Sequence, residues 1–362
     1  MSYVDDAKTY LDIGRKELPG LVFCVFVAVA SYVLTRGTLF EGGPRVLNAG
    51  LFSEDPLFSS LFKVGPIVLA LIIGLLVNFS PLAPGGVYSG KFLLRLAIVL
   101  MGARVTADVL SNASWVGIGI ILFVMAFTIC LSLFLGKRIK LDDDASALIG
   151  TGNSICGVSA CLSVAPAIKA KASNTHAVIG VISLLGLVGV FLVPWIAASL
   201  GLSPAQAEVL IGGSLHEIGN VIPAADLYHN AFGGEDIASL VLAYKMIRVA
   251  MLVVVAYILS RSFSRASGDG NAEVRMQGFL IAFVIVAALM SLLVYAFPDA
   301  GGQIRSAVVS SSASLLTVAM AGVGLSMDLR QTLSVGRKLL PVTALIWMAQ
   351  LALLLLLTRL LI

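Results

Sequence analysis

Runs of about 20 apolar residues recur along this chain, and they constrain its fold more than any other feature. A helix needs about 20 predominantly apolar residues to span the hydrocarbon core of a bilayer. Eleven segments approach that length, at roughly 20–36, 63–79, 89–108, 114–136, 145–168, 174–199, 204–226, 236–260, 276–297, 303–328 and 335–360. Only 12% of the residues are charged, against about 25% in a soluble domain. The sequence therefore predicts an all-α polytopic membrane protein of about 11 transmembrane helices.

Three of these segments, the fifth, seventh and tenth, are rich in Gly, Ser and Asn. They read ALIGTGNSICGVSACLSVAPAI, VLIGGSLHEIGNVIPAADL and VVSSSASLLTVAMAGVGLSM, and the first two also contain Pro. In lipid, a broken backbone is tolerated only where it is buried in protein or lines a wet cavity. We therefore expect these segments to avoid lipid. The residues expected to break helices are Gly150, Gly152, Pro166, Asn78, Pro81 and Pro223.

The basic residues between segments predict the orientation, because cytoplasmic loops carry an excess of Lys and Arg. With the N-terminus inside, 13 basic residues fall on the inner side and eight on the outer side. The segment 1–19 is then cytoplasmic and the C-terminus lies outside, provided that all 11 segments cross. Ten crossings, with a re-entrant seventh segment, would place the C-terminus inside.

A faint internal repeat relates the second and third segments to the seventh and eighth. Asn78-Phe79-Ser80-Pro81 ends the second segment, and Asn220-Val221-Ile222-Pro223 ends the seventh. LLRLAIVLMG surrounds Arg95 in the third segment, and MIRVAMLVVV surrounds Arg248 in the eighth. The fifth and tenth segments, both interrupted, also correspond.

This repeat predicts how one membrane domain is organised. Residues 63–199 and 204–362 form two five-helix repeats, and residues 20–62 form an extra N-terminal helix and loop. Because five is odd, the second copy inserts upside down relative to the first. Inverted repeats with interrupted helices in matching positions are typical of secondary transporters.

Ionisable side chains away from the segment ends are few: Arg95, His216, Glu217, Lys245 and Arg248. Each charge near the bilayer centre costs about 2.5–3.5 kcal/mol on insertion scales, so such groups usually face the bundle interior. We expect Glu217 with His216 to be an ion-coupling or gating pair. The three basic residues would set a cavity charge that attracts an anion. The alternative is a structural ion pair that locks two helices.

Small polar residues in the interrupted segments are candidates for solute contact. A half-helix that starts after a break aims free N–H groups and its positive dipole end at a bound anion. Tight helix packing is the alternative explanation for the same small residues. The predicted substrate contacts are Asn153, Ser154, Gly157, Ser159, Ser311, Ser312 and Asn220.

Two enzyme interpretations are disfavoured. His216-Glu217 begins like the zinc signature H-E-x-x-H, but position 220 is Asn, so the second imidazole ligand is missing. Ser159 would need a base from another segment, and His216 is the only histidine deep in one. We expect no catalytic residue, no metal and no cofactor. No phosphate-binding G-x-x-x-x-G-K-[ST] motif occurs, so an ion gradient is the expected energy source.

The strings KFLLRLAIVLMGARVT, GTGNSICGVSACLSVAPAI, GGSLHEIGNVIPAA, YKMIRVAMLV and MAGVGLSMDLR resemble the UPF0324 membrane family, the YeiH-like proteins. The resemblance runs from about residue 60 to the C-terminus, and the stretch 218–223 is somewhat divergent. The family carries the label of sulfate exporter. It is grouped with the cation/proton antiporter and anion transporter superfamily. The resemblance implies a sodium/proton-antiporter-like or bile-acid-symporter-like fold, with the fifth and tenth segments as broken crossing helices.

The function expected is secondary transport of a small anionic solute, such as sulfate or another sulfur-containing or carboxylate anion, across a bacterial inner membrane. The expected partners are that solute, a coupling ion (H⁺ or Na⁺) and the lipid bilayer, with a homodimer left open and no nucleic acid. The alternatives are an ion channel or a membrane sensor on the same scaffold; an intramembrane hydrolase is disfavoured.

Overall fold

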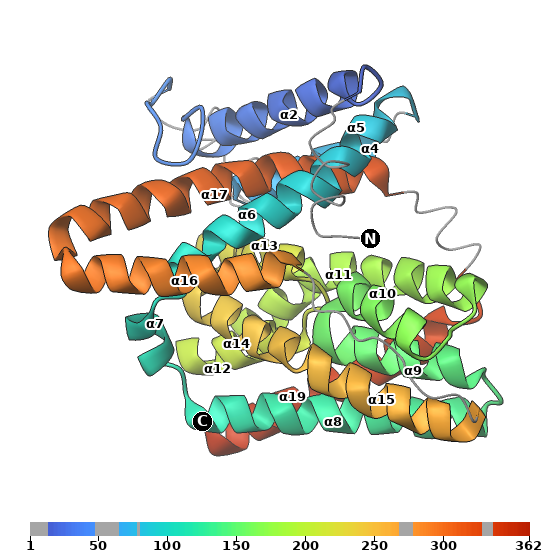
Figure 1. The fold of residues 1–362 in the computed structure, drawn as a ribbon. Helices are drawn as coiled ribbons and strands as arrows, with labels where there is room; N and C mark the ends of the chain where they lie inside the picture. The colour runs from blue at the N-terminus through green and yellow to red at the C-terminus, as the bar shows by residue number, and fades with distance from the viewer. Residues whose placement is uncertain (1–13, 48–64, 78–79, 268–277, 328–335) are drawn as a thin grey trace. The chain divides into compact units, whose positions relative to one another are not determined.

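The computed structural model describes residues 14–47, 65–77, 80–267, 278–327 and 336–362, and these are helical almost throughout (Figure 1). Eight helical stretches within them are long and apolar enough to cross a membrane: Leu18–Arg36, Ala83–Arg104, Trp115–Arg138, Asp143–Ala167, Ala172–Ser199, Ala238–Phe263, Pro298–Ser326 and Leu340–Leu361. Pro66–Val77 and Ile281–Ala296 are shorter apolar helices. The prediction of an all-α polytopic membrane protein is confirmed, whereas the count of 11 crossings stays a prediction.

The chain divides into two compact units. The first comprises Met1–Val109 and Gln277–Asp328, and the second Leu110–Met276 and Leu329–Ile362. Each unit draws on both halves of the sequence, so the units do not follow the expected repeat boundaries at 63–199 and 204–362. The inverted repeat itself stays a prediction.

The first unit is built around one long helix, α17. Its helices are α2 (Leu18–Arg36), α4 (Pro66–Val77), α5 (Ala83–Tyr88), α6 (Leu94–Met101), α16 (Gly278–Ala296) and α17 (Pro298–Ser326). A π-helical turn joins α5 to α6, and the short helix α7 (Ala107–Ser111) follows along the chain. Helix α17 packs against α2, α4, α5, α6 and α16.

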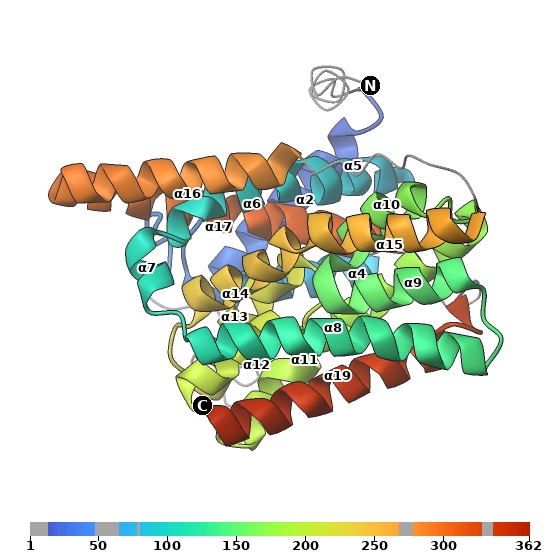
Figure 2. The same cartoon turned by 60° about the horizontal axis from the view of Figure 1, so that its bottom comes forward.

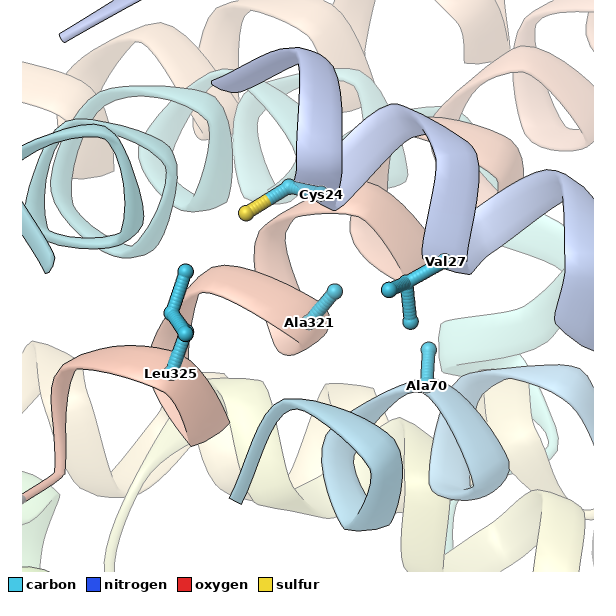
Figure 3. Packing of buried hydrophobic residues seen from close by; sticks show 5 residues of the cluster. All are labelled: Cys24, Val27, Ala70, Ala321 and Leu325. Atoms are coloured by element: carbon cyan, nitrogen blue, oxygen red, sulfur yellow. The ribbon is translucent and has the colours of Figure 1, made fainter. Parts of the chain in front are cut away.

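Small residues let α4 and α17 approach until their backbones touch. A Cβ atom on Gly74 would lie 2.2 Å from the carbonyl oxygen of Ala321, and one on Gly324 would lie 2.3 Å from that of Leu71. Close backbone approach through glycine is how helices gain packing contacts in lipid. Figure 3 shows the adjoining core, where side chains of α2, α4 and α17 meet: Cys24, Val27, Ala70, Ala321 and Leu325.

The predicted interruption of the tenth segment is wrong, because α17 runs unbroken from Pro298 to Ser326. The hydroxyls of Ser312, Ser314 and Thr317 donate to carbonyls three or four residues earlier in the same helix. Hydroxyl side chains can satisfy themselves in this way without opening a helix. The fifth and tenth segments are therefore not a pair of broken helices.

The second unit contains the fifth and seventh segments. Its helices are α8 (Trp115–Arg138), α9 (Asp143–Thr151), α10 (Gly157–Ala167), α11 (Ala172–Ser199), α12 (Pro204–Ser214), α13 (Ile218–Phe232), α14 (Ala238–Ala250), α15 (Leu252–Ser267) and α19 (Leu340–Leu361). Helices α8 and α19 lie side by side (Figure 2). Helix α11 packs against α10 and α13, and α14 packs against α12 and α13.

A polar network connects the starts of two helices of this unit. The Lys171 ammonium donates to Asp142 at 2.8 Å, its backbone N–H donates to Asp144 at 2.8 Å, and the Asn174 amide donates to both carboxylates. The hydrogen bond from Lys171 lowers the pKa of Asp142 below its ordinary value, and that from Asn174 adds to the effect. The start of α9 is thereby anchored to the start of α11.

Candidate functional site

In the second unit, the α9–α10 and α12–α13 segments are interrupted, and these two breaks form the candidate site. Helix α9 passes into a π-helical turn at Gly152–Cys156, and α10 starts at Gly157. Gly157 has φ +41° and ψ −119°, a conformation that side chains with a Cβ rarely adopt. The second break is extended: α12 ends at Ser214, Leu215 and Glu217 have ψ near 150°, and α13 starts at Ile218.

The two breaks lie against each other. A Cβ atom on Gly157 would lie 2.9 Å from Cγ of Glu217 and 3.4 Å from the carbonyl oxygen of His216. The Asn153 amide donates to the carbonyl of Thr343 on α19 at 3.2 Å, and its oxygen lies 2.9 Å from Nε2 of His216. Since an amide oxygen only accepts, Nε2 is the protonated ring nitrogen. Asn153 therefore links the first break to the second.

Lys245 of α14 joins the breaks through backbone carbonyls. Its Nζ donates to the carbonyl oxygens of Ile155 at 2.7 Å, Leu215 at 2.6 Å and His216 at 2.7 Å. The side chain is fully buried. One ammonium thus satisfies carbonyls from both breaks with all three of its N–H groups.

Arg248, one turn further along α14, makes a second set of such bonds. Nε and Nη2 donate to the carbonyls of Ser154 and Asn153 at 2.7 and 2.9 Å, and Nη1 donates to those of Gly212 and Leu215 at 3.0 and 2.9 Å. A helix end leaves carbonyls without intrahelical partners, and it also carries partial negative charge. Lys245 and Arg248 meet both demands at the ends of two half-helices.

Helix α19 completes the end of α12. Trp347 donates from its indole to the carbonyl of Ser214 at 3.3 Å, and Gln350 donates to that of Gly213 at 3.1 Å. Trp347 also lies against the imidazole of His216, with ring centroids 5.1 Å apart. The carbonyls of residues 212–216 thus all have side-chain donors, as a helix end inside a membrane requires.

Glu217 lies where the two later half-helices begin. It is the residue before the first turn of α13, and its Cγ approaches Gly157, the first residue of α10. Its carboxylate accepts a hydrogen bond from Ser183 of α11 at 3.0 Å. The N-termini of both half-helices carry partial positive charge and free N–H groups, to which a carboxylate or another anion is attracted.

Several buried polar atoms around the breaks have no hydrogen-bond partner among the described residues. They include Oγ of Ser154, Oγ of Ser214, Nδ1 of His216 and Oε1 of Gln350. A buried polar atom without a partner costs about 1–3 kcal/mol, so such atoms are rare in native proteins. Their concentration at the breaks is consistent with a site that a polar ligand or water completes.

The structure gathers most of the predicted site residues into the second unit. Asn153, Ser154, Gly157, His216, Glu217, Lys245 and Arg248 lie at the breaks. Ser159 lies in the first turn of α10, and Asn220 lies in the first turn of α13 with its side chain against Gly186.

Arg95, Ser311 and Ser312 belong to the first unit. The Arg95 guanidinium carbon lies 5.8 Å from the centroid of the Phe279 ring. Ser312 donates to the carbonyl of Val309 at 2.7 Å, and Ser311 is exposed on α17.

The predicted helix breaks are only partly correct. Gly152 begins the π-helical turn as predicted. Gly150 lies inside α9, Pro166 inside α10 near its end, and Pro223 inside α13, five residues after the true break. A proline inside a helix removes one i→i−4 hydrogen bond but need not end the helix, and membrane helices tolerate this loss. Pro81 lies in a short 3₁₀ turn between α4 and α5, and Asn78 lies outside the described residues.

The sequence did not indicate Ser183, Trp347 and Gln350 as site residues. A lone Gln350 within the apolar run of the last segment was the available signal. The carbonyl acceptors carry no sequence signal, because every residue has one.

Comparison with known proteins places the chain among membrane proteins. It matches the family described as Conserved hypothetical protein 698 over residues 19–343. It is 35% identical over 348 residues to a UPF0324 membrane protein of Wolinella succinogenes, covering 92% of this chain and 94% of the relative. A UPF0324 membrane protein of Helicobacter hepaticus is 30% identical over 317 residues, covering 81% and 90%. The UPF0324 inner membrane protein YeiH of Escherichia coli K12 is 30% identical over 331 residues, covering 89% and 87%. No solved structure matches the chain.

Proposed function

The chain belongs to the UPF0324 membrane protein family, and from this premise and the geometry of its second unit we propose that it is a secondary transporter of a small anionic solute. The observation that carries the proposal is the meeting of two interrupted helices, with Glu217 at the start of α13 and its side chain beside the start of α10. Discontinuous helices of this kind hold substrate and coupling ion in secondary transporters. The proposal involves no catalytic step.

The charges at the breaks favour an anion as solute. Lys245 and Arg248 are cationic and fully buried, and Glu217 is the carboxylate beside the breaks. The fixed charges therefore leave one positive charge uncompensated. Carbonyls use all three N–H donors of Lys245 and four of the five of Arg248. The solute would therefore contact half-helix N–H groups, and the cations would act on it mainly through their field.

Glu217 supports coupling to a cation. An ionised Glu217 and a bound anion would share the same two helix N-termini. Two like charges 4 Å apart repel by about 4 kcal/mol at an effective dielectric constant of 20. Anion binding should therefore be strongest when Glu217 is neutralised, by H⁺ or by a bound cation. That requirement would carry the cation with the anion in one transport cycle.

The bacterial inner membrane is the proposed location, since the E. coli relatives are inner membrane proteins by name. The excess of basic residues supports a cytoplasmic N-terminus. If the α12–α13 segment crosses the membrane, the C-terminus lies on the periplasmic side. A reporter fused after Ile362 tests this sidedness, and cytoplasmic activity would indicate a re-entrant segment instead.

Solute binding is the direct test. The unfolding temperature of the purified protein in detergent is measured against sulfate, sulfite, taurine and small carboxylates, for wild type, Glu217→Gln and Glu208→Gln. Glu208 is a buried carboxylate of α12 outside the breaks, so it controls for loss of a carboxylate as such. We expect saturable stabilisation by one class of anion. The affinity should increase in Glu217→Gln and lose its pH dependence there, while Glu208→Gln behaves as wild type.

No stabilisation by any anion, in any variant, would contradict the proposal. If anions raise the unfolding temperature equally, and with equal pH dependence, in wild type and Glu217→Gln, the anion site stands but Glu217 is not the coupling group. Counterflow in proteoliposomes with a clamped membrane potential then distinguishes a transporter from a channel. Only a carrier lets a gradient of unlabelled solute drive transient, saturable uptake of labelled solute.

A further inference from the structure

Backbone carbonyls at helix breaks are the usual ligands of coupling cations in secondary transporters. Unwound carbonyls and the C-terminal ends of half-helices coordinate Na⁺ there. In this chain, three such oxygens from the two breaks converge on one point, and that point holds the Nζ of Lys245.

The number of acceptors around that nitrogen matches its charged form. The carbonyls of Ile155, Leu215 and His216 all lie 2.6–2.7 Å from Nζ, and a carbonyl oxygen can only accept. An ammonium has three N–H donors, whereas a neutral amine has two. The charged form of Lys245 is therefore the one that satisfies all three oxygens, and in that form it stands among oxygen ligands as a free monovalent cation would.

Arg248 donates to the neighbouring carbonyls of the two breaks. It occupies the carbonyls of Asn153, Ser154 and Gly212 and shares that of Leu215. A free cation at the breaks would have to displace one tethered cation while lying beside the other. The Lys245 ammonium is favoured because the chain fixes its effective concentration at the site. A free cation is also repelled by the charge of Arg248.

We propose that the Lys245 ammonium takes the place of a coupling cation between the two helix breaks, so that this chain has no Na⁺ requirement. Without a Na⁺ requirement, H⁺ taken up at Glu217 is left as the coupling ion. This conclusion about transport rests on the proposed function. The statement about the breaks concerns the protein itself and does not depend on the identity of the solute.

Substitution of Lys245 by alanine gives the decisive comparison. Lys245→Ala removes the ammonium and leaves space beside three oxygens, whereas the control Lys171→Ala removes an exposed ammonium from a loop. The unfolding temperature of each protein is measured in NaCl, KCl and choline chloride at equal ionic strength. Wild type and Lys171→Ala should respond equally to the three salts. Lys245→Ala should unfold at a lower temperature and be stabilised saturably by Na⁺ over choline.

Each other outcome overturns part of the inference. Saturable stabilisation of wild type by Na⁺ alone would show a sodium site despite the ammonium. A folded Lys245→Ala without a Na⁺ response would show that the three oxygens do not form a cation site. If Lys245→Ala cannot be purified, Lys245→Met and the wild-type salt comparison decide, because wild type must be insensitive to Na⁺ in either case.

The anion measurements are repeated in the same salts, so that the two proposals can fail separately. Anion stabilisation that appears only in NaCl would overturn the sodium-independent reading and keep the transporter proposal. Absence of anion stabilisation in every salt would overturn the transporter proposal. The salt response of Lys245→Ala would still test whether the three carbonyl oxygens form a cation site.

Discussion

Replacement of Gly157 by alanine should disturb the candidate site in two ways at once. Gly157 combines φ +41° with ψ −119°, and it is the first residue of α10. A new Cβ would lie 2.9 Å from Cγ of Glu217 and 3.3 Å from Cγ2 of Ile182. Alanine thus meets both a disfavoured backbone conformation and the side chain that the site depends on.

The size of the effect follows from these two terms. A residue with a Cβ held in such a region costs about 1–3 kcal/mol. Relief by a movement of Glu217 would break or stretch its 3.0 Å hydrogen bond from Ser183, which costs about 1 kcal/mol more. We expect Gly157→Ala to lose about 2–4 kcal/mol of unfolding free energy and to weaken any anion-induced stabilisation.

Gly119→Ala is the matched control. Gly119 lies in α8, it is exposed, and a Cβ there would meet nothing within 4 Å. The free energy of unfolding is measured by denaturation in mixed detergent micelles. Equal stability of Gly157→Ala and Gly119→Ala would mean that neither the backbone conformation nor the approach to Glu217 constrains position 157.

Three further predictions concern other parts of the chain. Arg248→Lys should lower the unfolding free energy by about 1–3 kcal/mol, since one ammonium cannot reach every carbonyl that the guanidinium satisfies; unchanged stability in the same micelles would argue against this role. Gly324→Ala should cost about 1–3 kcal/mol through overpacking against a carbonyl of α4, whereas Gly302→Ala, with open space around it, should be neutral in the same measurement. On acidification, wild type should lose stability more steeply than Asp142→Asn, because the pKa of Asp142 is lowered in the fold by Lys171 and its contribution is lost as pH falls through that lowered value. Unfolding temperatures measured between pH 6 and pH 3, which brackets the ordinary pKa of about 3.9, test the last of these; parallel curves would contradict it.

The sequence predicted the membrane architecture because apolar runs reflect the surrounding lipid, which acts on every segment alike. It was less informative about which segments break. Gly152 and the polar stretch around His216 lie at true breaks. The serines of α17 also predicted a break, but the helix that contains them is continuous. A hydroxyl that bonds back to its own helix leaves no trace in a one-dimensional pattern.

The site residues were recognised better than their roles. Lys245 and Arg248 stood out because a charge in an apolar segment is expensive. Their partners could not be inferred, because the acceptors are main-chain oxygens 29 to 95 residues away in the sequence. The predicted role as a cavity charge is not tested by this geometry, which adds a structural role that the sequence did not suggest.

The carbonyl bonds of the breaks also determine the order in which the protein can mature at the ribosome. The side chain that donates to the carbonyl of Ile155 is synthesised 90 residues after it. The donors to the carbonyls of Ser214 and Gly213 are synthesised 133 and 137 residues after them. At synthesis rates of about 5–20 residues per second, the first delay alone is on the order of ten seconds. During that interval the nascent breaks must remain hydrated or shielded at the insertion machinery. The centre of the second unit is therefore among the last parts of the chain to become sealed from water during biogenesis.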